Sequence, residues 1–180
     1  MNTHAVVANG EFTISYRFFD DARVTEISLN INGRNILAFE RNGALLTTCW
    51  NLDELAEWLR NFIEHMTEDP YPVEADGEFA AVKDISARDL DGDDDEFDAY
   101  YDKMDEWNLR HRWHPASSGA ILADVYFQLV GENVEISWNN EEANNGIIFL
   151  NRRGGVRINK DVFYTKIDTF LKAYAAHWYC

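Results

Sequence analysis

The sequence predicts an α+β fold in which two similar antiparallel meander-plus-helix units pack as one body, with an acidic helical insert between them. Three observations predict it. Two distant segments share a strand-like pattern around the same Glu-Ile-Ser triplet, each is followed by an amphipathic segment, and acidic residues concentrate between them. The 180 residues suit a single domain, with a first ββββα unit at 11–66, the insert at 67–121 and a second ββββα unit at 122–178.

The repeated segments are SYRFFDDARVTEISLN at residues 15–30 and VYFQLVGENVEISWNN at residues 125–140. The shared triplet is Glu26-Ile27-Ser28 in the first and Glu135-Ile136-Ser137 in the second. A further apolar stretch and then an amphipathic segment follow each of them. This order favours an internal duplication, which bears directly on the fold.

In the first unit, apolar residues alternate from Phe12 to Phe18, as in a half-buried strand. A second strand is expected at 24–31, followed by the hairpin signal Asn32-Gly33. Strands at 36–39 and 44–48 are expected to pair around Arg41-Asn42-Gly43. A helix should begin at Asn51, whose spacing from Glu54 matches a capping box. Its apolar stripe comprises Leu52, Leu55, Leu59, Phe62, Ile63 and Met66.

The second unit repeats the plan, with strands near 124–130, 133–138, 146–150 and 155–158 and a helix from about 161 to 177. The stripe of this helix comprises Phe163, Ile167, Phe170, Leu171, Tyr174 and Trp178. One such unit alone is marginal for burying a core. We therefore expect the two units to pack together, with their helices covering one face of the antiparallel strands.

The charge is distributed unevenly. The formal net charge is −16, and residues 64–106, with 17 acidic and three basic side chains, hold −14 of it. A field of that sign repels nucleic acid and anionic lipid and attracts basic proteins. Direct binding to DNA or RNA is therefore not expected, because it needs a cationic surface.

Cysteine content and hydropathy indicate a soluble, cytoplasmic protein. Cys49 and Cys180 have neither the spacing of a zinc site nor that of a disulfide framework. The first ten residues lack the basic and apolar regions of a signal peptide. No apolar run approaches the roughly 20 residues of a membrane-spanning helix.

Within the insert, the run LDGDDDEFDAYYDKMDEW at residues 90–107 predicts a helix at about 94–108. Its apolar residues recur at helical spacing and form one stripe, and acidic residues fill the other positions. The stripe comprises Phe97, Tyr100, Tyr101, Met104 and Trp107. The rest of the insert from 73 to 92 looks irregular. A solvated acidic face is the simplest interpretation of the helix, and a landing surface for a basic protein is the functional one.

The sequence also leaves two other classes of function open. Asp89, Asp91 and Asp93 around Gly92 resemble a calcium loop poorly, because Ala87 would take the first ligand position. No nucleophile, phosphate-loop or zinc-protease motif is present. His111 and His114 are three residues apart, but no spacing in the sequence indicates that they converge with other ligands in a zinc or catalytic site. We therefore expect neither an enzyme nor a bound metal or cofactor. A calcium- or metal-binding regulatory module, or a small enzyme without a recognisable motif, remains an alternative.

The acidic segment from Asp89 to Glu106, with the aromatics inside it, gives the chain a likeness to a known group of proteins. In its size, acidity and aromatic content it resembles the immunity proteins of bacterial contact-dependent growth inhibition and related polymorphic toxin systems. That resemblance implies tight binding to one cognate toxin domain, often a basic nuclease, whose active site is blocked or covered. It implies no role for any particular residue.

Charge localisation predicts which residues meet such a partner. Acidic side chains would take positions that substrate phosphates otherwise occupy, and opposite charges would steer the encounter. The expected contact residues are Asp91, Asp93, Asp94, Asp95, Asp98, Tyr101, Asp102 and Asp105. An exposed sheet edge could add strand pairing with the same partner.

Overall fold

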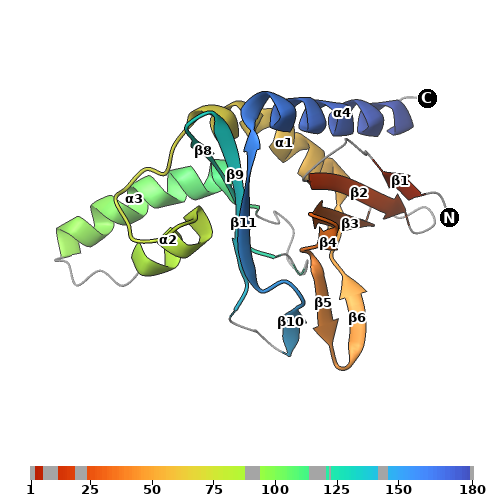
Figure 1. Cartoon of the computed structure of the whole chain (residues 1–180), viewed down its shortest axis with the longest axis horizontal. Coiled ribbons are helices and arrows are strands. Elements are labelled where there is room, and N and C mark those ends of the chain that lie inside the picture. Colours follow the sequence, from red (N-terminus) through yellow and green to blue (C-terminus); the bar gives the residue numbers. More distant parts are fainter. Residues whose placement is uncertain are drawn as a thin grey trace.

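In the computed structural model, runs of antiparallel strands are followed by helices: β1 to β7 precede α1 to α3, and β8 to β11 precede α4, which confirms the α+β class (Figure 1). The structure describes residues 3–5, 12–18, 24–87, 94–113, 121, 123–141 and 146–178. Two helices lie side by side along one side of the molecule, with the sheets below them, and two further helices flank one sheet at the far end. No helix among these residues is both long and apolar enough to cross a membrane.

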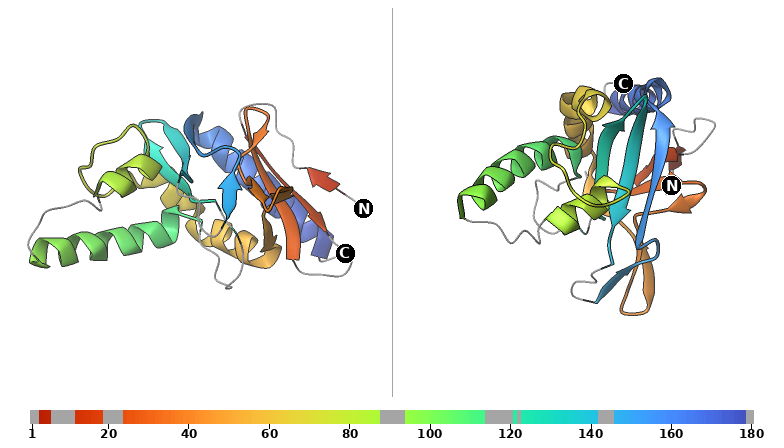
Figure 2. Two further views of the ribbon diagram at one scale, coloured as in Figure 1. Left: turned by 90° about the horizontal axis from the view of Figure 1, so that it is seen from below. Right: turned by 60° about the vertical axis from the view of Figure 1, so that its left-hand side comes forward.

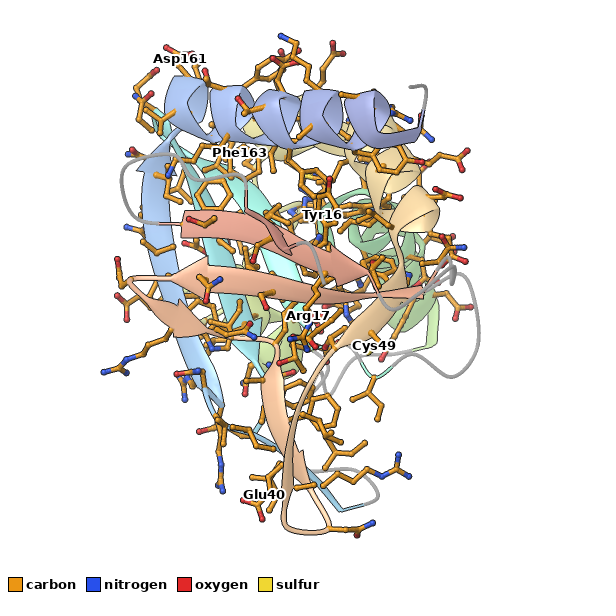
Figure 3. All side chains as sticks on the ribbon, turned by 90° about the vertical axis from the view of Figure 1, so that its right-hand side faces the viewer. Tyr16, Arg17, Glu40, Cys49, Asp161 and Phe163 are labelled. Atoms are coloured by element: carbon orange, nitrogen blue, oxygen red, sulfur yellow. The ribbon has the colours of Figure 1, made fainter. Side chains whose placement is uncertain are left out.

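The first sheet consists of β1 (Thr3–Ala5), β2 (Phe12–Phe18), β3 (Val24–Ile31), β4 (Arg34–Asn35) and β7 (Cys49–Asn51). β3 pairs antiparallel with β2, β4 and β7. The predicted alternation is present, because Tyr16 is buried against Phe170 while Arg17 points from the other face and pairs with Glu26 (Figure 3). The turn at Asn32-Gly33 has two positive φ angles, 49° and 76°, and confirms the predicted hairpin.

The second sheet has the order β11-β9-β8, formed by β8 (Val125–Val130), β9 (Asn133–Asn139) and β11 (Arg153–Asn159). The central strand β9 is buried from residue 134 to 138, so both of its faces are covered. Its Ile136 lies in the main core, whereas its neighbours Glu135 and Ser137 face the insert. This burial on both sides distinguishes the second sheet from a simple half-exposed meander.

The third sheet joins the two units and corrects the predicted pairing. It has the order β10-β5-β6, with β5 (Ala38–Arg41), β6 (Ala44–Thr47) and β10 (Ile147–Phe149). β5 and β6 pair around Asn42-Gly43 as expected. β10, however, pairs with β5 of the first unit, so neither unit is a self-contained four-stranded meander. Such a contact between residues about a hundred positions apart leaves no local signal in the sequence.

The two units share an order of elements. Each has a hairpin, β2–β3 or β8–β9, whose second strand also pairs with the strand leading into a helix, β7 or β11. This likeness agrees with an internal duplication but does not establish it, and the duplication stays a prediction. Glu26 and Glu135 occupy matching places, since each lies opposite a polar residue of its hairpin, Arg17 or Gln128.

The helices α1 (Leu52–Glu68) and α4 (Lys160–Trp178) follow β7 and β11 and pack against each other. The Asn51 side chain caps α1 by accepting from the Asp53 amide at 3.0 Å. Glu54 accepts a hydrogen bond from Trp50 Nε1 at 2.9 Å. Both predicted stripes enter one shared core, where Phe127 contacts rings from the two units. The residues of the two predicted stripes that are buried in it are Leu52, Leu55, Leu59, Ile63, Met66, Phe163, Ile167, Phe170 and Tyr174.

The insert contributes two helices, α2 (Ala80–Ala87) and α3 (Asp94–His111), on the side of the second sheet away from α1 and α4 (Figure 2). The helix expected at 94–108 is confirmed and runs to His111. The expectation of an irregular stretch at 73–92 is wrong for residues 80–87, which are helical. Hydrogen bonds to Glu135 and Ser137 of the second sheet stabilise this short helix.

Candidate functional site

The acidic helix α3 is docked by one side. Tyr100, Met104 and Trp107 are buried in a small cluster with Ala80 and Tyr126. Tyr101 is half-buried beside Tyr100, at a ring separation of 5.4 Å. The predicted apolar stripe is therefore confirmed for these four residues, whereas the side chain of Phe97 lies outside the described part of the structure.

The opposite side of α3 carries what we call the acidic stripe, Asp98, Asp102 and Asp105. Their spacing places them on one face, about 160° around the helix from the docked residues at 3.6 residues per turn. All three are exposed, and no ion pair within the described residues neutralises them. Leu109 continues the same face and is 56% exposed. The stripe is thus a charged ridge that ends in an apolar side chain.

The eight predicted contact residues divide into three groups. Asp98, Asp102 and Asp105 lie together as expected, and Tyr101 lies at the edge of the docked side, with part of its ring exposed. Asp94 and Asp95 belong to the first turn of α3, but their side chains are outside the described residues. Asp91 and Asp93 also lie outside the described residues, as does the rest of the possible calcium loop at 89–93.

Hydrogen bonds hold the C-terminal half of α3 in place. Trp107 Nε1 donates to the Pro70 carbonyl at 3.1 Å, and Trp58 Nε1 donates to the Leu109 carbonyl at 3.0 Å. The Trp107 ring stacks on His111 at 4.3 Å with an interplanar angle of 3°. These contacts come from both the first unit and the insert, so the acidic stripe stands on a fixed support.

His111, for which the sequence predicted no metal-binding or catalytic role, is fully buried. Its Nδ1 lies 2.7 Å from the Phe127 carbonyl and therefore donates to it. Its Nε2 lies 3.6 Å from Asp69 Oδ2, which His65 Nδ1 also approaches at 2.9 Å. Burial lowers the pKa of His111 to about 4, against the opposing effects of the Phe127 carbonyl and Asp69. The ring is neutral at pH 7 and serves to anchor α3. Extending the predicted stripe by one turn, from Trp107 to residue 111, would have found it.

A buried polar network holds α2, the other part of the insert. The carboxylate of Glu135, which is fully buried, accepts from the Ala80 amide at 2.8 Å and from Gln128 Nε2 at 2.7 Å. Its other oxygen lies 3.3 Å from the Arg157 guanidinium. A carboxylate at the first turn of a helix satisfies free N–H groups and the helix dipole. The repeated triplet therefore has a structural role here, because Ser137 Oγ also accepts from the Ala81 amide at 3.2 Å.

The described residues contain no group of three or more His, Cys, Asp or Glu side chains placed to hold a metal ion. Comparison of the chain with protein families, with curated proteins and with solved structures found no match. What the fold and the site define is thus an α+β body that presents an acidic helix held by buried side chains and hydrogen bonds.

Proposed function

We propose that this protein binds and inhibits a basic protein partner through the acidic stripe of α3, as an immunity protein binds its toxin. The observation that supports the proposal most directly is the stripe itself: three exposed aspartates in line, without counter-ions among the described residues, on a helix fixed from behind. Like charges three and four residues apart repel each other and destabilise a helix. A basic partner would relieve that repulsion.

The fixed position of α3 favours binding, because buried packing and hydrogen bonds already hold the helix and little of its backbone must become ordered on association. Interfaces lose affinity when side chains and loops must become ordered, and a pre-formed surface avoids much of that cost. Charge complementarity across the interface would raise the association rate, most strongly at low salt. Leu109, at the end of the stripe, would add an apolar contact of the kind found at interface centres.

The proposed partner is a cognate toxin domain, and a nuclease fits best. The substrate-binding surface of a nuclease is cationic because it holds phosphates, so a line of carboxylates can occupy the same positions. The proposal places the protein in the cytoplasm, where a nuclease toxin would meet its substrate. It assigns no catalytic role and no cofactor to the chain.

The proposal is tested with toxin domains encoded beside the gene, produced in catalytically inactive form. We expect at least one to bind at low salt, and the variant Asp98→Asn/Asp102→Asn/Asp105→Asn to associate with it about tenfold or more slowly. Surface plasmon resonance at low and high salt measures the association rate. The matched control, Glu57→Gln/Glu64→Gln/Glu68→Gln, removes the same number of exposed charges from α1 and should bind as the unaltered protein does. Equal loss in both variants would show that only net charge matters and would refute the stripe as the binding site.

A further inference from the structure

The third sheet carries an exposed apolar surface that the acidic helix does not explain. Four of the seven large hydrophobic side chains exposed among the described residues belong to it or adjoin it: Leu45, Leu46, Ile148 and Leu150. In Figure 1 this sheet extends away from the helices, with β6 on its outer side. Exposed apolar clusters of this kind mark interaction sites in proteins.

The strand register places most of this surface on one face. Ile148, Glu40 and Leu45 lie opposite one another across the three strands, and cross-strand neighbours share a face. Leu150 continues the ladder by donating its amide to the Ala38 carbonyl at 2.9 Å, so it lies two residues from Ile148 on the same face. We call these four residues, Leu45, Glu40, Ile148 and Leu150, the Leu45 face.

The backbone of β6 is available for pairing at its outer edge. The Ala38 carbonyl points to β10. Backbone groups of successive residues in a strand point to opposite sides, so those of Phe39 and Arg41 point to β6. Their partners on β6 are Leu46 and Ala44. The N–H and C=O groups of Leu45 therefore point outward. Within the described residues β6 is an edge strand, and its sequence Ala-Leu-Leu-Thr contains neither the proline nor the charged residue that usually protects an edge.

The charge of the protein indicates whether a second copy of this chain or a different protein binds to the Leu45 face. Each copy carries a net charge of −16, which opposes self-association. Glu40 is exposed in the middle of the Leu45 face and extends from the tip of the molecule (Figure 3). No ion pair with another described residue neutralises it. Two such faces in contact would oppose two carboxylates, whereas a basic chain would satisfy them.

We propose that an extended segment of a basic partner adds to the outer edge of β6 as a further strand. Its backbone pairs with Leu45, and the aliphatic part of a lysine or arginine covers the Leu45 side chain while its charged end reaches Glu40. Neighbouring strands lie about 4.8 Å apart, so one long side chain spans the single strand between them. Apolar residues at alternate positions of the segment extend this contact. The site deepens the proposed function and relies on it only for the identity of the partner.

The test uses a short synthetic peptide of alternating valine and lysine, capped at both ends, with the isotope-labelled full-length protein. NMR titration should shift the resonances of Leu45, Ile148 and Leu150 and slow amide exchange at Leu45. The variant Leu45→Pro removes only an outward N–H, a place where an edge strand tolerates proline. It should weaken peptide binding about tenfold or more. A peptide of the same pattern with a proline at its centre should bind as poorly.

Two further variants keep the test decisive if Leu45→Pro fails to fold. Glu40→Gln and Ile148→Thr both preserve the backbone, and each should weaken binding several-fold, whereas Val162→Thr, at an exposed position on α4, should have no effect. Two results would overturn the proposal: peptide-induced changes in NMR resonances that are confined to α3, or unchanged peptide affinity in Leu45→Pro, Glu40→Gln and Ile148→Thr. The variant that lacks the acidic stripe should still bind the peptide at β6. If the acidic stripe of α3 proves not to bind a toxin domain, peptide binding at β6 can still be observed. If the peptide does not bind at β6, the proposed role of α3 is still open to its own test.

Discussion

At the scale of single residues, a few buried polar side chains decide how the insert is held. Glu135 and His111 each receive or donate hydrogen bonds from deep inside the protein, and neither is exposed. Their types were visible in the sequence, but their burial was not, because it depends on elements that approach from elsewhere in the chain. The exposed aspartates of α3, by contrast, follow from helical spacing alone.

His111 makes the stability of the protein depend on pH. Its pKa is 6.5 in an unfolded chain and about 4 in the folded protein, so between these values only the unfolded state binds the proton. The free energy of unfolding therefore falls as pH decreases from about 6.5 to about 4, by an amount on the order of 3 kcal/mol, and His111 adds no further change below that.

Urea unfolding from pH 7 to pH 4 measures this dependence, and His111→Asn, which retains a donor for the Phe127 carbonyl, should reduce its slope. Leu109→Asn, at an exposed position of the same helix, removes no titratable group and serves as the control, so it should leave the slope nearly unchanged. If His111→Asn has the same slope as the unaltered protein, His111 is not the titrating group.

At the scale of elements, local patterns predicted most boundaries but not the pairing of β10 with β5. Alternation and helical spacing are properties of neighbouring residues, so β2, β3, α1, α3 and α4 were all recognisable. Helix α2 was missed because its eight residues, AAVKDISA, are too short to show a stripe. Its stability comes from Glu135, Ser137 and the hydrogen bond from Tyr126 to Asp84 at 2.8 Å. Tertiary contacts of this kind outweigh local propensity.

The docking of α2 also depends on the absence of a side chain at Gly155. A Cβ atom at this position of β11 would lie 2.5 Å from the ring of Phe79, which precedes α2. Gly155→Ala should therefore displace Phe79 and destabilise the protein by about 1–3 kcal/mol, as overpacking does. Chemical denaturation measures the loss of stability. In the variant, the backbone amides of residues 80–84 should exchange with solvent faster than those of α1. The neighbouring exposed residue serves as control, since Arg153→Ala should change stability by less than about 0.5 kcal/mol. Unchanged stability of Gly155→Ala would mean that α2 is not held through Phe79.

At the scale of the whole molecule, the acidic stripe and the Leu45 face belong to different parts of the fold. The core joins the two units, and the insert adds a second layer on one sheet. Helix α3, which carries the acidic stripe, and the hairpin of β5 and β6, which carries Glu40 and Leu45, project in different directions (Figure 2). The net charge located in the insert could be read from the sequence, and so could the helix that carries it. The second surface could not, because it requires β10 from one unit to lie beside β5 from the other.

The acidic stripe should lower the stability of the unbound protein. Asp98 and Asp102 are four residues apart, Asp102 and Asp105 three, and each such like-charged pair destabilises a helix by a few tenths of a kcal/mol. We therefore expect Asp98→Asn/Asp102→Asn/Asp105→Asn to raise the free energy of unfolding by about 1 kcal/mol at low salt. High salt screens exposed charges, so the difference should largely vanish there, which urea unfolding at the two salt concentrations would show. A variant that binds its partner more slowly but is itself more stable would separate the two effects of the stripe. If the variant is instead less stable at low salt, the aspartates stabilise the fold. A structural role would then explain why they are present, without a binding partner.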